Sequence, residues 1–147
     1  MAKNIEKQYQ IKYSRNKLLI SDITGKYEID LKKRLLDFSI NTLRFLMTLP
    51  YKKEFDVLRY QLSRSATSIG ANYREAQTST INEFLQKIRI ALREANESSY
   101  WFEIILGLRI ADENTVKSLY KESNEIALIL GSIAAKLDRK RKLESTR

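Results

Sequence analysis

The chain has 147 residues, of which 43% are hydrophobic and 31% are charged, and these proportions are typical of one soluble domain with a hydrophobic core. It contains no cysteine and no histidine, which excludes disulfides, Cys/His zinc sites and catalysis by Ser-His-Asp or Cys-His groups. With four glycines and one proline, the sequence favours long helices over a turn-rich β architecture, so we expect an all-α protein.

The net charge of +9 is concentrated at the two ends of the chain. Residues 1–29 carry six basic and three acidic residues (net +3), residues 136–147 carry six and two (net +4), and residues 30–135 are left with +2. Basic ends of this kind are typical of segments that contact a polyanion, either nucleic acid or an acidic surface. The same charge can also serve solubility alone.

The first 29 residues have neither an apolar signal core nor a helical period. Weak alternation and a turn signal at Thr24-Gly25 predict an irregular basic arm with room for a short hairpin. Its tyrosines, Tyr9, Tyr13 and Tyr27, could stack on unpaired bases. The chain has no run of about 18 apolar residues, so we expect a cytoplasmic protein without a membrane span.

Residues 30–49 are predicted to form the first helix, with Asp30 as its N-cap and Pro50 as its stop. Residues at steps of three and four form the face that packs on the core. The members of this face are Leu31, Leu35, Phe38, Thr42, Phe45 and Leu49. Three further leucines widen the apolar face, so we expect this helix to contact two others. They are Leu36, Leu43 and Leu46.

Residues 53–77 are predicted to form the second helix, which carries two stripes at helical spacing. The apolar stripe, expected in the core, consists of Phe55, Leu58, Leu62, Ala66, Ile69, Tyr73 and Ala76. The small polar stripe consists of Gln61, Ser65, Ser68, Asn72 and Glu75. Short polar side chains let another helix come close and must find partners when buried, so the second stripe predicts a hydrogen-bonded seam.

The third helix is predicted to start at Thr80, which forms a capping-box pattern with Glu83, and to end near Leu108. Its core face consists of Phe84, Ile88, Ala91, Ala95, Phe102 and Ile105, broadened by Leu85 and Leu92. A second stripe consists of Lys87, Ile90, Glu94, Glu97, Trp101 and Ile104. This stripe places two acids beside the chain's one tryptophan.

The fourth helix follows the turn at residues 112–114, and its apolar period ends at Leu137, before the basic run 139–142. Its core face consists of Val116, Leu119, Ser123, Ile126, Leu130, Ile133 and Leu137. Four helices of about 20 to 30 residues with short connections predict an up-down-up-down four-helix bundle. We therefore divide the chain into an irregular basic arm (1–29), the bundle (30–137) and a basic C-terminal tail (138–147).

A motif in the second and third helices resembles a bacterial family of four-helix-bundle proteins, which includes proteins encoded in intervening sequences of 23S ribosomal RNA genes. The motif reads Gln61-Leu62-x-Arg64-Ser65-Ala66-x-Ser68-Ile69-x-Ala71-Asn72-x-x-Glu75-Ala76, and it continues through Phe84, Ala91, Glu94, Glu97, Ser98, Tyr100 and Trp101. The resemblance covers roughly residues 30–135. Similar proteins, the accessory proteins of diversity-generating retroelements, are homopentameric barrels whose basic surface contacts nucleic acid and a reverse transcriptase. The resemblance therefore implies a homopentameric ring.

Arg64 lies near the polar stripe of the second helix, while Glu94 and Glu97 lie one turn apart on the third. We expect an Arg-Glu and Asn-Ser network that fixes helix register or a subunit contact. The residues of this expected seam are Gln61, Arg64, Ser65, Ser68, Asn72, Glu75, Glu94 and Glu97. A hydrolase or nuclease with Glu75, Glu94 and Glu97 around a divalent ion is the contrasting hypothesis. Di-metal sites in helical bundles usually need Glu-x-x-His motifs, so we expect no enzyme, no metal and no cofactor.

Basic residues on the second and third helices and in the tail could form a phosphate-binding surface, although a solvated helix face has the same pattern. The candidate contacts are Arg59, Arg74, Lys87, Arg89, Arg93, Arg139, Lys140, Arg141 and Lys142. The first hypothesis is a non-enzymatic, oligomeric scaffold that associates with RNA or DNA without base specificity. The alternative is a protein-interaction module whose ring docks a partner such as a reverse transcriptase.

Overall fold

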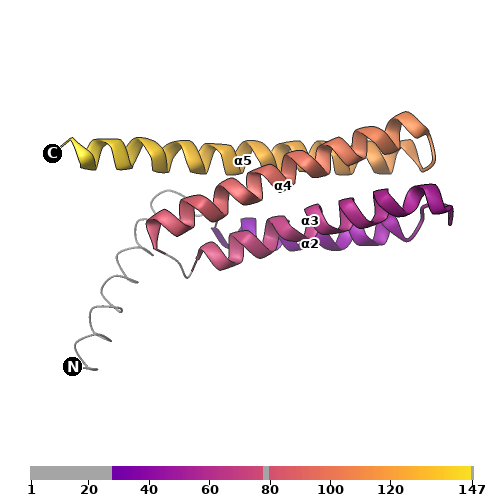
Figure 1. The fold of residues 1–147 in the computed structure, drawn as a ribbon, viewed down its shortest axis with the longest axis horizontal. Coiled ribbons are helices and arrows are strands. Elements are labelled where there is room, and N and C mark those ends of the chain that lie inside the picture. Colours follow the sequence, from indigo (N-terminus) through magenta and orange to yellow (C-terminus); the bar gives the residue numbers. More distant parts are fainter. Residues whose placement is uncertain (1–27, 78–79, 147) are drawn as a thin grey trace, which may run out of the picture.

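The computed structural model describes residues 28–77 and 80–146, and these residues form four α-helices and one short 3-10 helix (Figure 1). In chain order the elements are α2 (Glu28–Leu46), η2 (Lys53–Phe55), α3 (Asp56–Ala76), α4 (Ile81–Leu108) and α5 (Glu113–Ser145). No strand occurs in this part of the chain. The expected all-α class and number of helices are confirmed. The arm predicted for residues 1–29 lies outside the described residues up to position 27.

Helix α2 differs at its start from the prediction. It begins at Glu28, so Asp30 lies inside the first turn and is not the N-cap. After Leu46 the chain continues in turns, where the amide of Thr48 donates to the carbonyl oxygen of Phe45 at 2.9 Å, before it reaches Pro50.

Arg59 of α3 holds the connection between α2 and α3. Its guanidinium donates to the carbonyl oxygen of Leu49 at 2.9 Å and also to that of Pro50. The same group lies 5.1 Å from the ring centroid of Tyr51 and bonds Asp56. Arg59 therefore satisfies two backbone carbonyls of the loop that follows α2 and joins this loop to α3.

Local capping interactions fix both ends of α4. The capping box is confirmed, because the Thr80 hydroxyl accepts from the amide of Glu83 at 3.4 Å and the Thr80 amide donates to the Glu83 carboxylate at 2.8 Å. At the other end Arg109 takes the left-handed conformation, φ 53°, and closes the helix with its amide. Asp112 then caps α5 by accepting from the hydroxyl and the amide of Thr115, and these two bonds lower the pKa of Asp112.

Helix α4 packs along its length against α3 on one side and α5 on the other (Figure 1). Small residues make this close approach possible, namely Ala91, Ala95, Ser98 and Ser99, all of them buried. The Ser98 hydroxyl lies 2.9 Å from that of Ser65 on α3, and the Ser99 hydroxyl lies 2.7 Å from that of Ser123 on α5. Two serine pairs therefore join α4 to α3 and to α5 from adjacent positions of α4.

The core is formed by the predicted core faces of the four helices, of which Phe55 and Leu92 remain partly exposed. Phe102 of α4 lies against two phenylalanines of α2, with ring centroids 6.4 Å from Phe38 and 6.1 Å from Phe45. These aromatic contacts join α2 to α4. Helix α2 has more extensive contact with α3 than with α5.

Helix α5 continues beyond its apolar face. Leu137 is its last buried residue, yet the helix runs on to Ser145. Lysine and arginine are good helix formers, so the basic run extends the helix although it has no apolar face to bury. The predicted basic tail is thus helical to Ser145, and Figure 1 shows this end of α5 projecting past the first turn of α4. None of the helices in the described ranges is long and apolar enough to cross a membrane.

The capping box predicts a cost for removing the Thr80 hydroxyl. Thr80→Ala leaves the amide of Glu83 without its side-chain acceptor and should lower the free energy of unfolding by about 0.5–2 kcal/mol. Thr80→Ser keeps the hydroxyl and is the matched control. Chemical denaturation of both variants measures the effect, and equal stability of the two would contradict a capping role.

Candidate nucleic-acid interface

The predicted polar seam is only partly buried. Ser65 is its one fully buried member on α3, and it forms the cross-helix bond to Ser98. Asn72 is half-buried, and its amide group donates to the backbone and side-chain oxygens of Ser68 at 2.9 and 3.0 Å. Gln61 is half-buried as well. The Asn-Ser contact therefore lies within α3 and does not join it to α4.

The expected buried Arg-Glu network is absent from the described residues. Arg64 is exposed and forms no ion pair with Glu94 or Glu97. The reason is its position one residue before the buried Ser65, which turns Arg64 about 100° round the helix toward solvent. Glu97 instead accepts a bond from the indole nitrogen of Trp101 at 3.2 Å.

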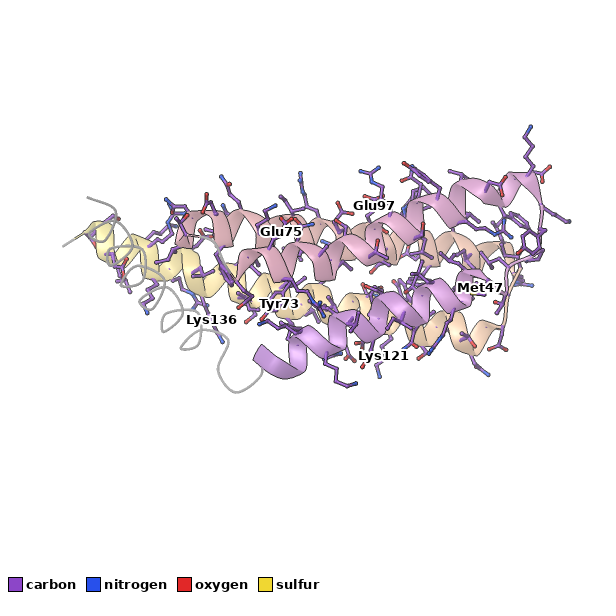
Figure 2. The ribbon with its side chains drawn as sticks, turned by 90° about the horizontal axis from the view of Figure 1, so that it is seen from below. Met47, Tyr73, Glu75, Glu97, Lys121 and Lys136 are labelled. Carbon is purple, nitrogen blue, oxygen red and sulfur yellow. The ribbon has the colours of Figure 1, made fainter. Side chains whose placement is uncertain are left out.

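Among the acids on this face, Glu94 is the one whose pKa is shifted from its ordinary value. Burial raises the pKa of its carboxyl above the ordinary value, the charge of Glu97 adds to this effect, and Arg64 and Arg93 oppose it. Glu75 lies farther along and pairs with Lys87 across the α3–α4 boundary. Figure 2 labels Glu75 and Glu97 at separate positions along the molecule. In the described part of the chain, no cluster of acids is placed to hold a metal ion.

The basic residues predicted on α3 and α4 divide into two groups. Three of them are engaged in the structure: Arg59 holds the α2–α3 connection, Lys87 pairs with Glu75, and Arg89 donates to both carboxylate oxygens of Asp138 at 2.9 and 2.8 Å. Arg74 and Arg93 are exposed, and neither forms an ion pair with a described residue. Of the five predicted contacts on these helices, Arg74 and Arg93 are therefore the two without an ion-pair partner among the described residues.

The densest positive charge lies at the C-terminal end of α5, which we call the basic helix end. It comprises Lys136, Arg139, Lys140, Arg141 and Lys142. Lys140 is partly exposed, the other four are exposed, and none forms an ion pair with a described residue. Asp138, the one acid among them, is bonded to Arg89. Figure 2 shows Lys136 at one end of the molecule and Met47 at the other.

An apolar surface covers the outer side of α2, and we call it the α2 stripe. Leu36, Ile40, Leu43 and Met47 follow one another at helical spacing, with exposed fractions of 43%, 37%, 41% and 77%. A shallow groove of about 600 Å³ adjoins Leu43 and Met47 and reaches Tyr60 of α3, which is itself exposed. As expected, α2 contacts two other helices, α3 and α5. Of the three leucines predicted to widen its apolar face, Leu46 is buried in the core, whereas Leu36 and Leu43 remain exposed. The sequence patterns did not single out Ile40 or Met47.

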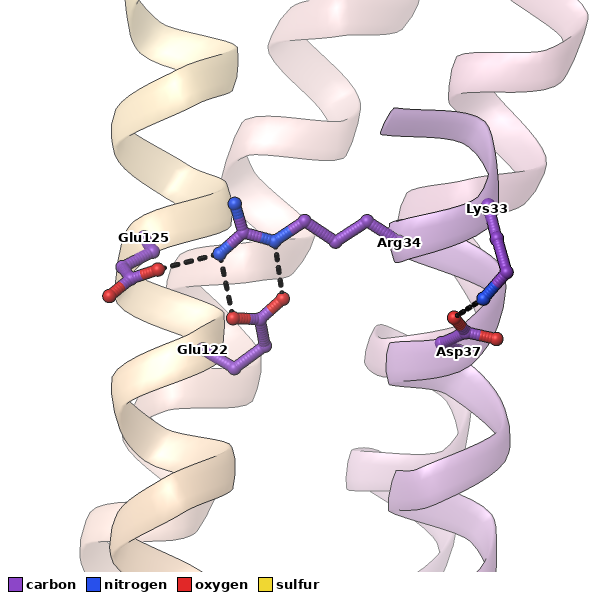
Figure 3. Close-up of polar contacts among 5 residues, drawn as sticks. All are labelled: Lys33, Arg34, Asp37, Glu122 and Glu125. Carbon is purple, nitrogen blue, oxygen red and sulfur yellow. Dashed lines mark hydrogen bonds and ion pairs between the residues drawn. The ribbon is translucent and has the colours of Figure 1, made fainter. Parts of the chain in front are cut away.

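Arg34 forms an ion-pair cluster between α2 and α5 that the sequence did not suggest (Figure 3). It donates to both oxygens of Glu122 at 2.6 and 2.7 Å and to Glu125 at 2.6 Å. The bonds to Glu122 and Glu125 raise the pKa of Arg34. A polar groove of about 640 Å³ runs beside the cluster. Because 88 residues separate Arg34 from Glu122, only the register of the folded helices brings them together.

In a comparison with known proteins, residues 28–132 match one family model, which is described as 23S rRNA-intervening sequence protein. A crystal structure is also similar, that of a protein of unknown function from the S23 ribosomal protein family of Bacteroides thetaiotaomicron VPI-5482. The two chains are 34% identical with a TM-score of 0.66, and the match covers 71% of this chain and 97% of that one. No curated protein sequence matches the chain. The family match begins at the start of α2 and ends before the basic helix end.

The raised pKa of Glu94 predicts how stability depends on pH. The folded chain holds the Glu94 proton more tightly than the unfolded chain, so stability falls as the pH rises through the range just above 4.5, the ordinary value. Glu94→Gln removes this dependence. The variant should therefore be more stable than the parent chain at neutral pH, with the difference shrinking as the pH falls toward 4.

Thermal unfolding at a series of pH values measures this difference. Glu54→Gln, at an exposed position of η2, controls for the loss of one negative charge on a basic protein. A difference between Glu94→Gln and the parent chain that stays constant from pH 4 to pH 7 would rule out the effect.

Proposed function

The chain belongs to the 23S rRNA-intervening sequence protein family, and on that premise we propose that it is a non-enzymatic, oligomeric scaffold that binds nucleic acid through phosphate contacts. The observation that carries the proposal is the basic helix end, where five cations stand without an ion-pair partner among the described residues. Phosphate contacts release counterions and need no particular base, so binding is salt-sensitive and not sequence-specific.

We further propose that the chain is an up-down-up-down bundle that assembles into a homopentameric ring. The α2 stripe supports assembly, because contiguous apolar surface on a folded chain is typical of a protein interface. The number five comes from the resemblance to homopentameric accessory proteins of retroelements. A ring repeats each basic helix end, and several weak phosphate contacts made together give an affinity that no single one provides.

The α2 stripe and the basic helix end lie at different places on the chain, so assembly and nucleic-acid binding can be altered separately (Figure 2). Charge introduced into the stripe should affect assembly first. Charge reversed at the helix end should affect binding while the oligomer stays intact. The two predictions that follow use this separation.

The first prediction concerns assembly. Light scattering coupled to size exclusion should give five times the chain mass of 17.2 kDa, and Leu43→Glu with Met47→Glu should reduce it because charge is buried in the interface. Leu128→Glu, at an exposed apolar position of α5 outside the stripe, is the control. A parent mass near 17.2 kDa at micromolar concentration would refute assembly, and an unchanged mass of the double variant would refute the stripe as its interface.

The second prediction concerns binding. Within each type of nucleic acid, RNA or DNA, the intact oligomer should bind unrelated base sequences with similar affinity, and the affinity should fall steeply between about 50 and 200 mM salt. Arg141→Glu with Lys142→Glu should weaken binding to all sequences by about tenfold or more. Lys52→Glu with Lys53→Glu changes the same charge at exposed positions by η2 and should have a smaller effect.

Two results would contradict the binding prediction. Affinity that survives high salt would exclude phosphate contacts as its source. Absence of binding at low salt would favour the protein-interaction alternative, for which a reverse transcriptase is the partner that the resemblance implies. In that case the basic helix end would serve only solubility.

A further inference from the structure

The basic helix end is a single helix that leaves the bundle. The buried face of α5 ends at Leu137, and positions 139–146 are exposed except for the partly exposed Lys140. Figure 1 shows this segment beyond the first turn of α4. Eight residues after Leu137 extend the helix by about 12 Å at 1.5 Å per residue. The projecting segment therefore offers its whole circumference to a ligand.

The cations surround this helix rather than lying on one side of it. Successive residues of an α-helix are about 100° apart, so the four consecutive basic residues 139–142 point in four directions, and Lys136 fills part of a remaining gap. A helix that lay along one row of phosphates would contact it with only some of these cations. In a groove with a phosphate backbone on each side, nearly all of the cations can contact a phosphate.

Asp138 is the one acid in this segment before Glu144, and its charge is already neutralised. Both of its oxygens accept from Arg89 of α4. The ion pair, in which one guanidinium nitrogen of Arg89 donates to both oxygens, also joins the base of the projecting segment to the bundle. A phosphate that approaches the segment therefore meets a positively charged helix whose first residue is bonded to α4.

The dimensions of the segment fit one form of nucleic acid. An α-helix with its side chains is about 10–12 Å wide, and the major groove of B-form DNA is about 12 Å wide and 8.5 Å deep. The major groove of A-form RNA is deep and narrow and does not admit a helix of this width. Single strands have no pair of phosphate walls.

We propose that the basic helix end enters the major groove of B-form duplex DNA, so that the duplex form of DNA is the preferred polyanion of this protein. The inference rests on the proposed phosphate-binding function and adds to it a choice among nucleic acids. The contacts are to the two phosphate backbones that border the groove, so the choice depends on helix form and not on base sequence.

Fluorescence anisotropy of the full chain tests the choice directly. One 20-base-pair sequence is prepared as DNA duplex, as RNA duplex and as single-stranded DNA, and all three are titrated in the same buffer at about 100 mM salt. The DNA duplex should bind at least tenfold more tightly than the RNA duplex. A DNA duplex with bulky groups on C5 of its pyrimidines, which project into the major groove, should lose most of this advantage.

A pair of variants separates helix geometry from charge. Asp138→Pro and Asp138→Ala both remove the acid and release Arg89, but only proline breaks the helix at the root of the segment. Asp138→Ala should keep the preference for duplex DNA. Asp138→Pro should still bind both duplexes in a salt-sensitive way, with the preference reduced to less than threefold, and circular dichroism checks that the bundle stays folded.

The outcomes distinguish this inference from the function on which it rests. Equal affinity of the parent chain for DNA and RNA duplexes overturns the groove inference and leaves phosphate binding in place. Salt-sensitive binding to none of the three ligands overturns both. A preference for DNA that the C5 groups do not reduce, or that Asp138→Pro retains, also overturns insertion into the groove.

Discussion

The close contact of α4 with both α3 and α5 is the constraint on which the rest of the structure depends. Ala91, Ala95, Ser98 and Ser99 keep the face of α4 small, so two helices can approach it at once, and the serine hydroxyls bond to a partner on each side. Each buried hydroxyl also has a backbone acceptor one turn away, as the bonds from Ser98 to Glu94 and from Ser99 to Ala95 show. The two pairs therefore fix the positions of α3, α4 and α5 along one another, and each of the four serine hydroxyls has a hydrogen-bond partner.

This arrangement leaves the charged and apolar surfaces of the chain in different places. Helix α2 reaches the core through its phenylalanines and meets α5 through Arg34, so its outer apolar side stays exposed as the α2 stripe. Helix α5 is longer than its buried face, so its basic end projects. A chain built in this way can assemble through one surface and keep the other open for a polyanion, which is the basis of the proposed function.

Local patterns predicted much of this fold from the sequence. The capping box of Thr80 and Glu83 spans four residues, and the core faces repeat at helical spacing, so both depend on neighbours along the chain. The extent of α5 was missed because the prediction followed the apolar face and not the helix propensity of the basic run. The Arg34 cluster depends on how helices far apart in sequence are turned toward each other. The spacing within one helix does not contain that information.

The most direct test of this account is hydrogen exchange of the native protein, followed helix by helix. If α4 is the helix held from both sides, the amides around Ser98 should exchange only through global unfolding, and those of α2 should exchange faster through local opening. Protection in α2 equal to or greater than that in α4 would contradict the central place given to α4.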